Sequence, residues 1–264
     1  MAKIFCIANQ KGGVGKTTTA VNLAAGLAQI GQRVLLVDLD PQGNATMGAG
    51  IEKAKLSISI YEVLLGMAEI KEALVRSEAG GFDVLPANRE LAGAEVEMVA
   101  LDNREKRLKD ALAQLADAYD FMLIDCPPAL SMLTLNGLCA ANGVIIPMQC
   151  EYYALEGLSD LVNTIKRVHA KLNPDLKLIG LLRVMFDPRM TLSQQVSAQL
   201  EQHFGDKVFK TVIPRNVRLA EAPSYGLPGV NFDPSSKGAQ AYIAFGAEMV
   251  ERIGSSSPDV AVPV

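Results

Sequence analysis

Residues 11–18 read KGGVGKTT and stand between a short apolar run at 4–8 and a segment with helical apolar spacing at 17–29. The common phosphate-binding loop is G-x-x-x-x-G-K-[ST], but here its first position is Gln10 and a second lysine, Lys11, precedes the glycines. A strand–loop–helix context places a bound anion at a helix N-terminus, where free N–H groups and the helix dipole favour it. The stretch therefore predicts a nucleotide-phosphate site, with Lys11 acting within its own chain or across a dimer.

Apolar strand-like runs alternate with amphipathic segments along the rest of the chain. This pattern is typical of an α/β fold with a doubly wound, mostly parallel sheet and helices on both faces. The further strand candidates are 34–37, 84–85, 121–124, 143–147, 178–184 and 208–213. The helix candidates are 17–29, 104–118, 154–172, 192–204 and 237–253, with shorter pieces at 60–65 and 70–76. We expect one P-loop domain over 1–253 and a disordered tail over 254–264, which is rich in Ser, Pro and small residues.

The composition of the 264 residues suits one large α/β domain, because 49% are hydrophobic and no linker interrupts them. No stretch of 18 apolar residues occurs, and the first residues (MAK) lead directly into a strand, so we expect a cytoplasmic protein without a signal peptide. The four cysteines lack metal-site spacing, and Cys6 and Cys150, which lie in or beside apolar strand-like runs, are interpreted as reduced core residues. For Cys126, which follows a candidate site aspartate, packing is favoured over a redox role. The cysteines are Cys6, Cys126, Cys139 and Cys150.

Two strand candidates end in aspartate. Residues 33–40 read RVLLVDLD, and Asp38 and Asp40 would face the same way if the strand extended that far. Residues 121–125 read FMLID and end in Asp125. Ligands of open α/β sheets bind at the carboxyl ends of the strands, and a carboxylate there can hold Mg²⁺ directly or through water. Asp125 is therefore a candidate Walker-B carboxylate, although a lone strand-end aspartate is often only a turn former or a helix cap.

Together, KGGVGKTT at 11–18, VDLDPQGNAT at 37–46 and IDCPP at 124–128 resemble the deviant Walker ATPases. Within that group, QCEYYALEGL at 149–158 and IPRNVRLAEAPSYG at 213–226 are similar to the ParA/Soj chromosome- and plasmid-partitioning proteins. The resemblance extends from about residue 2 to about residue 252. It implies ATP and Mg²⁺ as cofactors and hydrolysis of ATP to ADP and phosphate as the reaction.

The resemblance also implies a role for each motif residue. Lys11 would reach the phosphates of the other subunit in a nucleotide-sandwich dimer, Lys16 would bind phosphate, and Asp40 would position the attacking water. Thr17 and Asp125 would hold Mg²⁺, and the segments 38–46 and 125–136 would be switches that sense the γ-phosphate. The remaining implied nucleotide contacts are Gly12, Gly13, Val14, Gly15 and Thr18 in the loop, with Met185, Asp187, Pro214 and Asn216 at the adenine.

Further implications concern partners. The family resemblance implies an ATP-bound homodimer that binds non-specific double-stranded DNA through Arg189 and Arg218, and hence association with the nucleoid. Its expected partner is a ParB/Spo0J-like centromere-binding protein that stimulates an otherwise slow hydrolysis. Residues 183–218 hold six basic and three acidic residues, or +3, so the rest of this −4 chain carries −7. A local basic patch is sufficient for phosphate contacts, although such a segment can also be an ordinary solvated surface.

The main alternative is a MinD-like membrane-associated positioning ATPase, which would need a C-terminal amphipathic helix with basic and bulky apolar faces. Residues 237–253 are instead followed by GSSSP, so we expect their apolar side chains to pack on the sheet and expect no membrane partner. An iron-protein type would need paired cluster-ligating cysteines, which the cysteine positions do not match. A ligase-type metabolic relative would need a substrate pocket that the sequence does not reveal.

Overall fold

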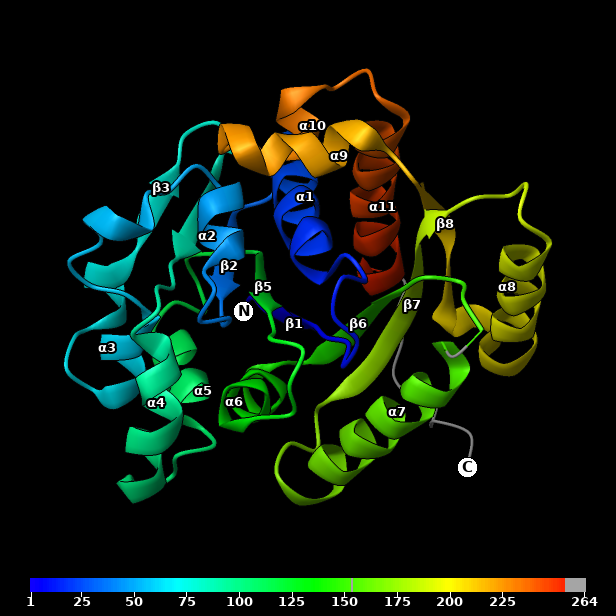
Figure 1. The fold of residues 1–264 in the computed structure, drawn as a ribbon. Helices are drawn as coiled ribbons and strands as arrows, with labels where there is room; N and C mark the ends of the chain where they lie inside the picture. Colours follow the sequence, from blue (N-terminus) through cyan, green and yellow to red (C-terminus); the bar gives the residue numbers. More distant parts are fainter. Residues whose placement is uncertain (153, 255–264) are drawn as a thin grey trace.

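The computed structural model describes residues 1–152 and 154–254 (Figure 1). One sheet runs through them in the strand order β3-β4-β2-β5-β1-β6-β7-β8. Neighbouring strands are parallel except for β3, which pairs with β4 in the antiparallel sense. The strands are β1 (Lys3–Ile7), β2 (Val34–Asp38), β3 (Val75–Ser77), β4 (Phe82–Leu85), β5 (Phe121–Asp125), β6 (Gly143–Met148), β7 (Lys177–Phe186) and β8 (Val208–Pro214).

Helices cover both faces of the sheet (Figure 1). One face packs against α1 (Lys16–Gln29), α2 (Asn44–Gly48), α9 (Val217–Glu221), α10 (Gly229–Phe232) and α11 (Lys237–Gly254). The other packs against α3 (Ile60–Leu65), α4 (Leu91–Glu97), α5 (Arg107–Ala113), α6 (Met132–Ala140), α7 (Ala154–Lys171) and α8 (Thr191–Phe204). Short 3-10 turns are η1 (Lys53–Lys55), η2 (Ile70–Ala73), η3 (Met98–Ala100), η4 (Gly205–Lys207) and η5 (Ala222–Tyr225).

Strands β2 and β5 are buried along their whole length because helices cover both sides of them. Every residue of β2 and β5 is buried, as their unbroken apolar sequences predict. In the register of the sheet, Asp125 stands beside Ile7 of β1 on one side and beside Asp38 of β2 on the other. The carboxyl ends of three central strands therefore meet directly beside the loop that follows β1.

The predicted α/β fold class is confirmed, and each predicted strand is present with ends within two residues of those expected. The segment 70–76, for which the sequence predicts a short helix, instead consists of the 3-10 turn η2 followed by the start of β3. Helix α5 is shorter than predicted, and α4 and α6 were not predicted. The sequence of α6, MLTLNGLCA, lacks a polar stripe because nearly all of this helix is buried, so its amphipathic signal is absent. Helix α11 includes Gly254, which we had assigned to the tail; residues 255–264 lie outside the described residues.

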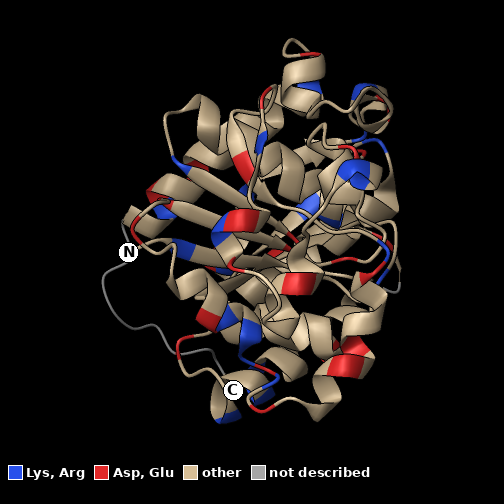
Figure 2. Ribbon diagram, turned by 90° about the vertical axis from the view of Figure 1, so that its left-hand side faces the viewer, with Lys and Arg blue, Asp and Glu red and all other residues tan. Residues whose placement is uncertain are grey.

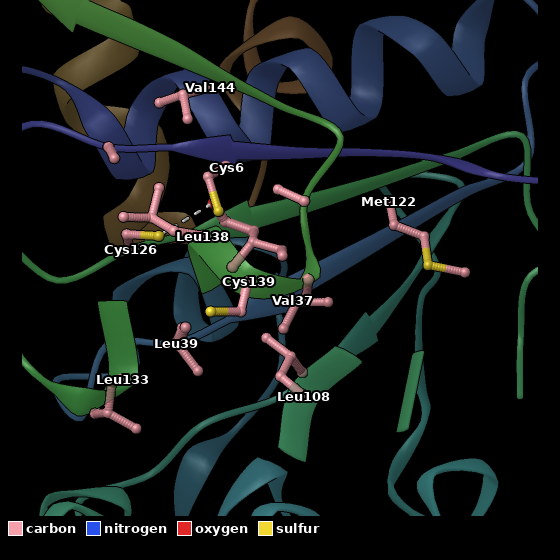
Figure 3. Close-up of a cluster of buried hydrophobic side chains, with 14 of the residues drawn as sticks. Cys6, Val37, Leu39, Leu108, Met122, Cys126, Leu133, Leu138, Cys139 and Val144 are labelled. Atoms are coloured by element: carbon pink, nitrogen blue, oxygen red, sulfur yellow. Dashed lines mark hydrogen bonds between the residues drawn. The ribbon is translucent and has the colours of Figure 1, made fainter. Parts of the chain in front are cut away.

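The core beneath the site is closely packed around α6 (Figure 3). A Cβ added to Gly137 would lie 3.1 Å from Sγ of Cys126 and 3.2 Å from Sγ of Cys6, closer than such contacts normally come. All four cysteines are reduced and buried, as expected for packing residues. Burial raises the pKa of the Cys6 thiol well above its usual value, which keeps it in the unreactive thiol form.

Among the helices of residues 1–152 and 154–254, none combines the length and the apolar character needed to cross a bilayer.

Candidate active site

The loop at 11–18 joins β1 to α1, which begins at Lys16. Gly13 and Gly15 have φ angles of 73° and 78°, in the left-handed region that favours glycine. A Cβ added to Gly12 or Gly13 would meet no heavy atom within 4 Å, so the space beside this part of the loop is open. The glycine conformation thus lets the backbone approach a ligand closely at the N-terminus of a 14-residue helix.

Lys16 is a buried ammonium group at the start of α1, with 7% of the residue exposed. Among the described residues, its Nζ donates one hydrogen bond, 3.0 Å long, to the carbonyl oxygen of Lys11. Burial lowers the pKa of Lys16, and the nearby carboxylates of Asp125 and Asp40 partly oppose this effect. Since an ammonium group has three donors, Lys16 can offer further hydrogen bonds to an anion held in the loop.

Asp125 is fully buried at the end of β5, and neither carboxylate oxygen has a hydrogen-bond partner in the described part of the chain. Burial, reinforced by Asp38, raises the pKa of Asp125 well above its usual value. The Thr17 hydroxyl is close enough to lower that pKa, but it forms no hydrogen bond to the carboxylate. A buried carboxylate without partners is costly, and a hard cation with oxygen ligands would relieve that cost. Asp125 and Thr17 therefore fit a Mg²⁺ site.

Asp38 is buried like its neighbour, but its oxygens are occupied. The carboxylate accepts hydrogen bonds from the Thr46 amide (2.8 Å), the Thr46 hydroxyl (2.7 Å) and the Asp40 amide (3.2 Å). Burial raises the pKa of Asp38 to about 6 against the effect of these hydrogen bonds. Thr46 Oγ1 also accepts from the Ala87 amide at 2.9 Å. Asp38 thus anchors the segment 40–46 to the sheet rather than facing a ligand.

Asp40 lies beyond the end of β2, so the condition under which Asp38 and Asp40 would face the same way, a strand extending to Asp40, is not met. Its Oδ1 accepts from the Gln42 amide at 2.9 Å, and its carbonyl oxygen accepts from the Gly43 amide at 2.8 Å. The side chain is partly exposed and close enough to Lys16 to act on its pKa. This turn holds the Asp40 carboxylate at the open edge of the site.

Replacing Thr46 with valine should destabilise the protein by about 1–3 kcal/mol, because the change keeps the shape and removes the hydroxyl. Asp38 would lose one hydrogen-bond donor, and the buried Ala87 amide would lose its acceptor. Chemical denaturation measures the loss, and Thr46→Ser is the matched control because it keeps the hydroxyl. Equal stability of the valine and serine variants would contradict the anchoring role.

The segment after β6 supplies contacts that sequence reasoning did not assign. Nζ of Lys11 forms an ion pair with Glu151 of the same chain at 2.6 Å, and both side chains are about half exposed. Nε2 of Gln149 donates to the Gly13 carbonyl (3.3 Å) and to the sulfur of Met185 (3.0 Å). A usable signal was present, since polar residues directly after a parallel strand lie at the ligand-binding edge of the sheet.

The residues predicted to contact adenine lie at the ends of β7 and β8, where Phe186 pairs with Pro214. The Met185 side chain reaches the phosphate loop, because its methyl carbon is 3.6 Å from a Cβ built on Gly15. Asn216 caps α9 by accepting from the backbone amides of residues 218 and 219 at 2.8 and 3.3 Å. Met185 is thus close to the loop, and the Asn216 side-chain oxygen is engaged in its own helix.

The two arginines predicted to bind DNA are exposed but ion-paired. Arg189 forms a bidentate pair with Asp187 through hydrogen bonds of 2.9 and 2.7 Å, which lower the pKa of Asp187 to about 2. Arg218 contacts Glu221 at 2.9 Å and Asp233 at 3.4 Å.

Of the six basic residues counted in 183–218, Arg183 is buried beside Glu201, which is one of the three acidic residues, so this pair adds no net charge and Arg183 is not an exposed cation. On the opposite side of the molecule, near α3 and α4, acidic and basic residues are interspersed (Figure 2). That side does not present a surface of one sign.

A groove of about 850 Å³ lies between the α2–η1 connection, residues 88–90 and η5. It is lined by Met47, Ile51, Arg89 and Tyr225 among others and includes no residue of the predicted site. A smaller recess of about 30 Å³ touches Thr17 and extends from the start of α1.

Comparisons with known proteins agree with the geometry. A family model described as an AAA domain matches residues 2–178. The chain is 53% identical to the chromosome partitioning protein ParA of Myxococcus xanthus (strain DK1622), covering 98% of this chain and 91% of that protein. It is also 53% identical to the sporulation initiation inhibitor protein Soj of Bacillus subtilis (strain 168), covering 94% and 98%.

A solved structure described as cobyrinic acid a,c-diamide synthase from Mycobacterium smegmatis, with bound ATP analogue and magnesium, has the same fold. It superposes with a TM-score of 0.85 at 43% identity, covering 97% of each chain. The family resemblance inferred from the motifs is confirmed: this chain belongs to the ParA/Soj family of chromosome-partitioning ATPases.

Proposed function

We propose that this ParA/Soj-family ATPase is a DNA-segregation switch that uses ATP and Mg²⁺. ATP closes a homodimer, the dimer binds DNA without sequence preference, and a ParB/Spo0J-like partner stimulates hydrolysis and release. The observation that carries the nucleotide part is the unpartnered, buried carboxylate of Asp125 beside the open glycine loop and the buried ammonium of Lys16. The DNA step is supported by the similarity to a protein named for chromosome partitioning, and the dimer and the partner are what membership of the ParA/Soj family leads us to expect.

The phosphates would be bound by the amides of the loop at 11–18, by Lys16 and, near the α-phosphate, by Thr18. Thr17 and Asp125 would hold Mg²⁺, which neutralises charge on the β- and γ-phosphates. Phosphoryl transfer needs an aligned nucleophile more than covalent help, so Asp40 would orient the attacking water. The motifs at 11–18, 37–46 and 124–128 contain no histidine or glutamate that could act as a base, which supports slow hydrolysis in the absence of the partner.

Lys11 has a separate role in this proposal. In the single chain its ammonium is paired with Glu151. An ion pair between half-exposed groups contributes at most about 1 kcal/mol, so a triphosphate can readily displace Glu151. Lys11 would then bind the nucleotide of the partner subunit and make dimer closure depend on ATP.

A ligase-type function is less well supported. An amide-forming enzyme would need a second substrate beside the phosphates, but the 850 Å³ groove includes no residue of the predicted site. The similarity to ParA of M. xanthus, at 53% identity, also exceeds the 43% shared with the synthase structure.

Replacing Arg189 with glutamate should weaken DNA binding by about tenfold or more, because a phosphate-contacting cation becomes an anion. The change also leaves Asp187 without its ion pair, so the local charge changes from neutral to −2. Binding of the ATP-bound protein to random-sequence duplex DNA, measured at several salt concentrations, tests this. ATP-driven dimerisation should persist, and unchanged DNA affinity and salt dependence would show that the patch is misassigned.

The same DNA-binding assay, run with ATP and with ADP, tests the function as a whole. Binding of the protein to a membrane surface is measured beside it. Tight, salt-sensitive DNA binding with ATP but not with ADP is the expected result. Dimerisation with ATP but no binding to DNA would contradict the DNA step and leave the ATPase assignment in place. Co-sedimentation with vesicles containing anionic lipid would then favour the MinD-like alternative.

A further inference from the structure

The pairing of β7 with β8 is irregular close to the nucleotide site. Leu181 pairs with Val208 and Arg183 pairs with Val212, so β8 uses two more residues than β7 over this stretch. Such a bulge releases backbone groups from the ladder, bends the strand and changes the direction of the residues that follow. Because β8 is the last strand of the sheet, the released groups have no further strand to pair with.

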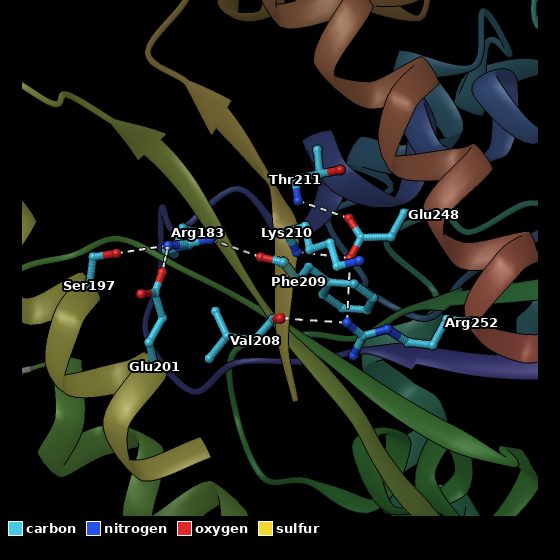
Figure 4. A network of polar contacts seen from close by, with 9 residues as sticks. All are labelled: Arg183, Ser197, Glu201, Val208, Phe209, Lys210, Thr211, Glu248 and Arg252. Atoms are coloured by element: carbon cyan, nitrogen blue, oxygen red, sulfur yellow. Dashed lines mark hydrogen bonds and ion pairs between the residues drawn. The ribbon is translucent and has the colours of Figure 1, made fainter. Parts of the chain in front are cut away.

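Two charged side chains pair these released groups (Figure 4). Nη2 of Arg183 donates to the carbonyl oxygen of Phe209 at 2.8 Å. The backbone amides of Lys210 and Thr211 both donate to the carboxylate of Glu248, each at 2.8 Å. The bulge of β8 is therefore fixed from one side by a residue of β7 and from the other by a residue of α11.

Both side chains are themselves fixed. Arg183 is buried, and its Nη1 donates to Ser197 at 2.8 Å and pairs with Glu201, both on α8. Arg252, one turn beyond Glu248 on α11, contacts that carboxylate at 3.3 Å. The contacts join β7, β8, α8 and α11 into one network, so the register of the two strands is strongly specified (Figure 4).

The register determines where the strand ends lie. Between the Arg183–Val212 pair and the Phe186–Pro214 pair, β7 contains one residue more than β8. Met185 lies in this stretch and adopts a left-handed φ of 50°. That conformation is uncommon for a residue other than glycine and needs support from its surroundings. It places the Met185 methyl carbon 3.6 Å from a Cβ built on Gly15, directly against the phosphate loop.

We propose that Arg183 and Glu248 are positioning residues for the nucleotide base. They would touch no nucleotide atom and act by fixing the β7–β8 register, which sets the positions of residues 185–187 and 214–216 relative to the loop. This inference rests on the proposed ATPase function and on the adenine contacts that the family resemblance implies for those segments. It predicts that loss of either side chain affects recognition of the base more than binding of the phosphates.

The test compares ATP with inorganic tripolyphosphate, both with Mg²⁺, by calorimetry on the full chain. In Arg183→Met and Glu248→Gln, affinity for ATP should fall about tenfold while affinity for tripolyphosphate stays within about twofold, because only the base loops move. Arg183→Lys, which keeps one donor for the Phe209 carbonyl, should recover part of the loss. Arg33→Gln is the control: it breaks the ion pair with Asp120 (2.7 Å) at the opposite ends of the strands and should change neither affinity.

Parallel loss of both ligands, or no loss of either, would overturn the positioning role. If Arg183→Met does not fold, Glu248→Gln decides the matter, because glutamine keeps the shape of this partly exposed side chain. A native protein that binds ATP no better than tripolyphosphate would refute the adenine contacts themselves, and the positioning role with them. If the native protein binds ATP more tightly than tripolyphosphate and the variants bind both ligands as the native protein does, only the positioning role is refuted.

Discussion

Asp40→Ala should produce a protein that binds ATP with nearly native affinity, accumulates as a dimer and hydrolyses ATP about 100-fold more slowly or worse. The expected size follows from the cost of a misplaced nucleophile, since loss of alignment alone lowers rates by about two orders of magnitude. Asp40 is partly exposed, and among the described residues its side chain accepts a hydrogen bond only from the Gln42 amide, while its backbone contacts do not depend on the side chain, so the fold should tolerate the change. Lys16 and Asp125, which would bind the phosphates and Mg²⁺, are untouched by it.

Light scattering with ATP and with ADP measures the dimer, and phosphate release measures turnover. Asp40→Asn is the matched control, because its amide oxygen can still accept from the Gln42 amide and so preserves the turn while removing the charge. Both variants should form the long-lived ATP dimer and bind random-sequence DNA in a salt-sensitive way. An alanine variant that remains monomeric with ATP would contradict the assignment of Asp40.

The sequence was sufficient to predict the fold class because two signals agreed. Unbroken apolar runs such as FMLID identify strands that are buried on both faces, and their alternation with amphipathic segments leaves few other topologies. Helix α6 could not be predicted in this way, because a helix that is buried on nearly all sides has no polar stripe and therefore no amphipathic pattern. Strand β3 was missed because three residues at a sheet edge are too few for a periodic pattern.

The site residues could be predicted where the chemistry of the site requires a particular residue type. They were harder to predict where the role of a residue depends on how the side chains around it pack. Glycines with left-handed φ angles and a strand-end aspartate are required by the chemistry of a phosphate loop and a metal site. In contrast, Asp38 and Asp125 have the same residue type, the same burial and adjacent positions in the register. Within the described part of the chain, however, the carboxylate of Asp38 is hydrogen-bonded and that of Asp125 is not. That difference depends on where Thr46 lies, which the pattern along the strand does not contain.

Surface charge was the least predictable feature. The count over residues 183–218 treated every arginine as part of one patch, but Arg183 is buried in the β7–β8 network. Arg189 and Arg218 are exposed and already share their charge with carboxylates. Because a charge becomes a surface feature only through the position of its side chain, a net charge counted along the sequence does not determine the local potential.

Lys16→Ala should nearly abolish ATP binding. The Lys16 ammonium is buried and forms only one hydrogen bond, to the carbonyl of Lys11, among the described residues. Removing one partner of a buried, hydrogen-bonded charge pair costs about 2–5 kcal/mol, which converts to roughly 30-fold to several thousand-fold in affinity. Calorimetric titration with Mg²⁺-ATP measures this loss.

Lys11→Ala is the control for that experiment, because it removes an exposed lysine of the same loop. The Lys11 ammonium forms its ion pair with Glu151 on the outer side of the site, so its loss should leave ATP binding by the single chain within a few-fold of native. Dimerisation with ATP should fail in this variant if Lys11 reaches the partner's nucleotide. Comparable ATP affinities for the Lys16→Ala and Lys11→Ala proteins would contradict the division of roles, because burial is the physical basis on which the two lysines are distinguished.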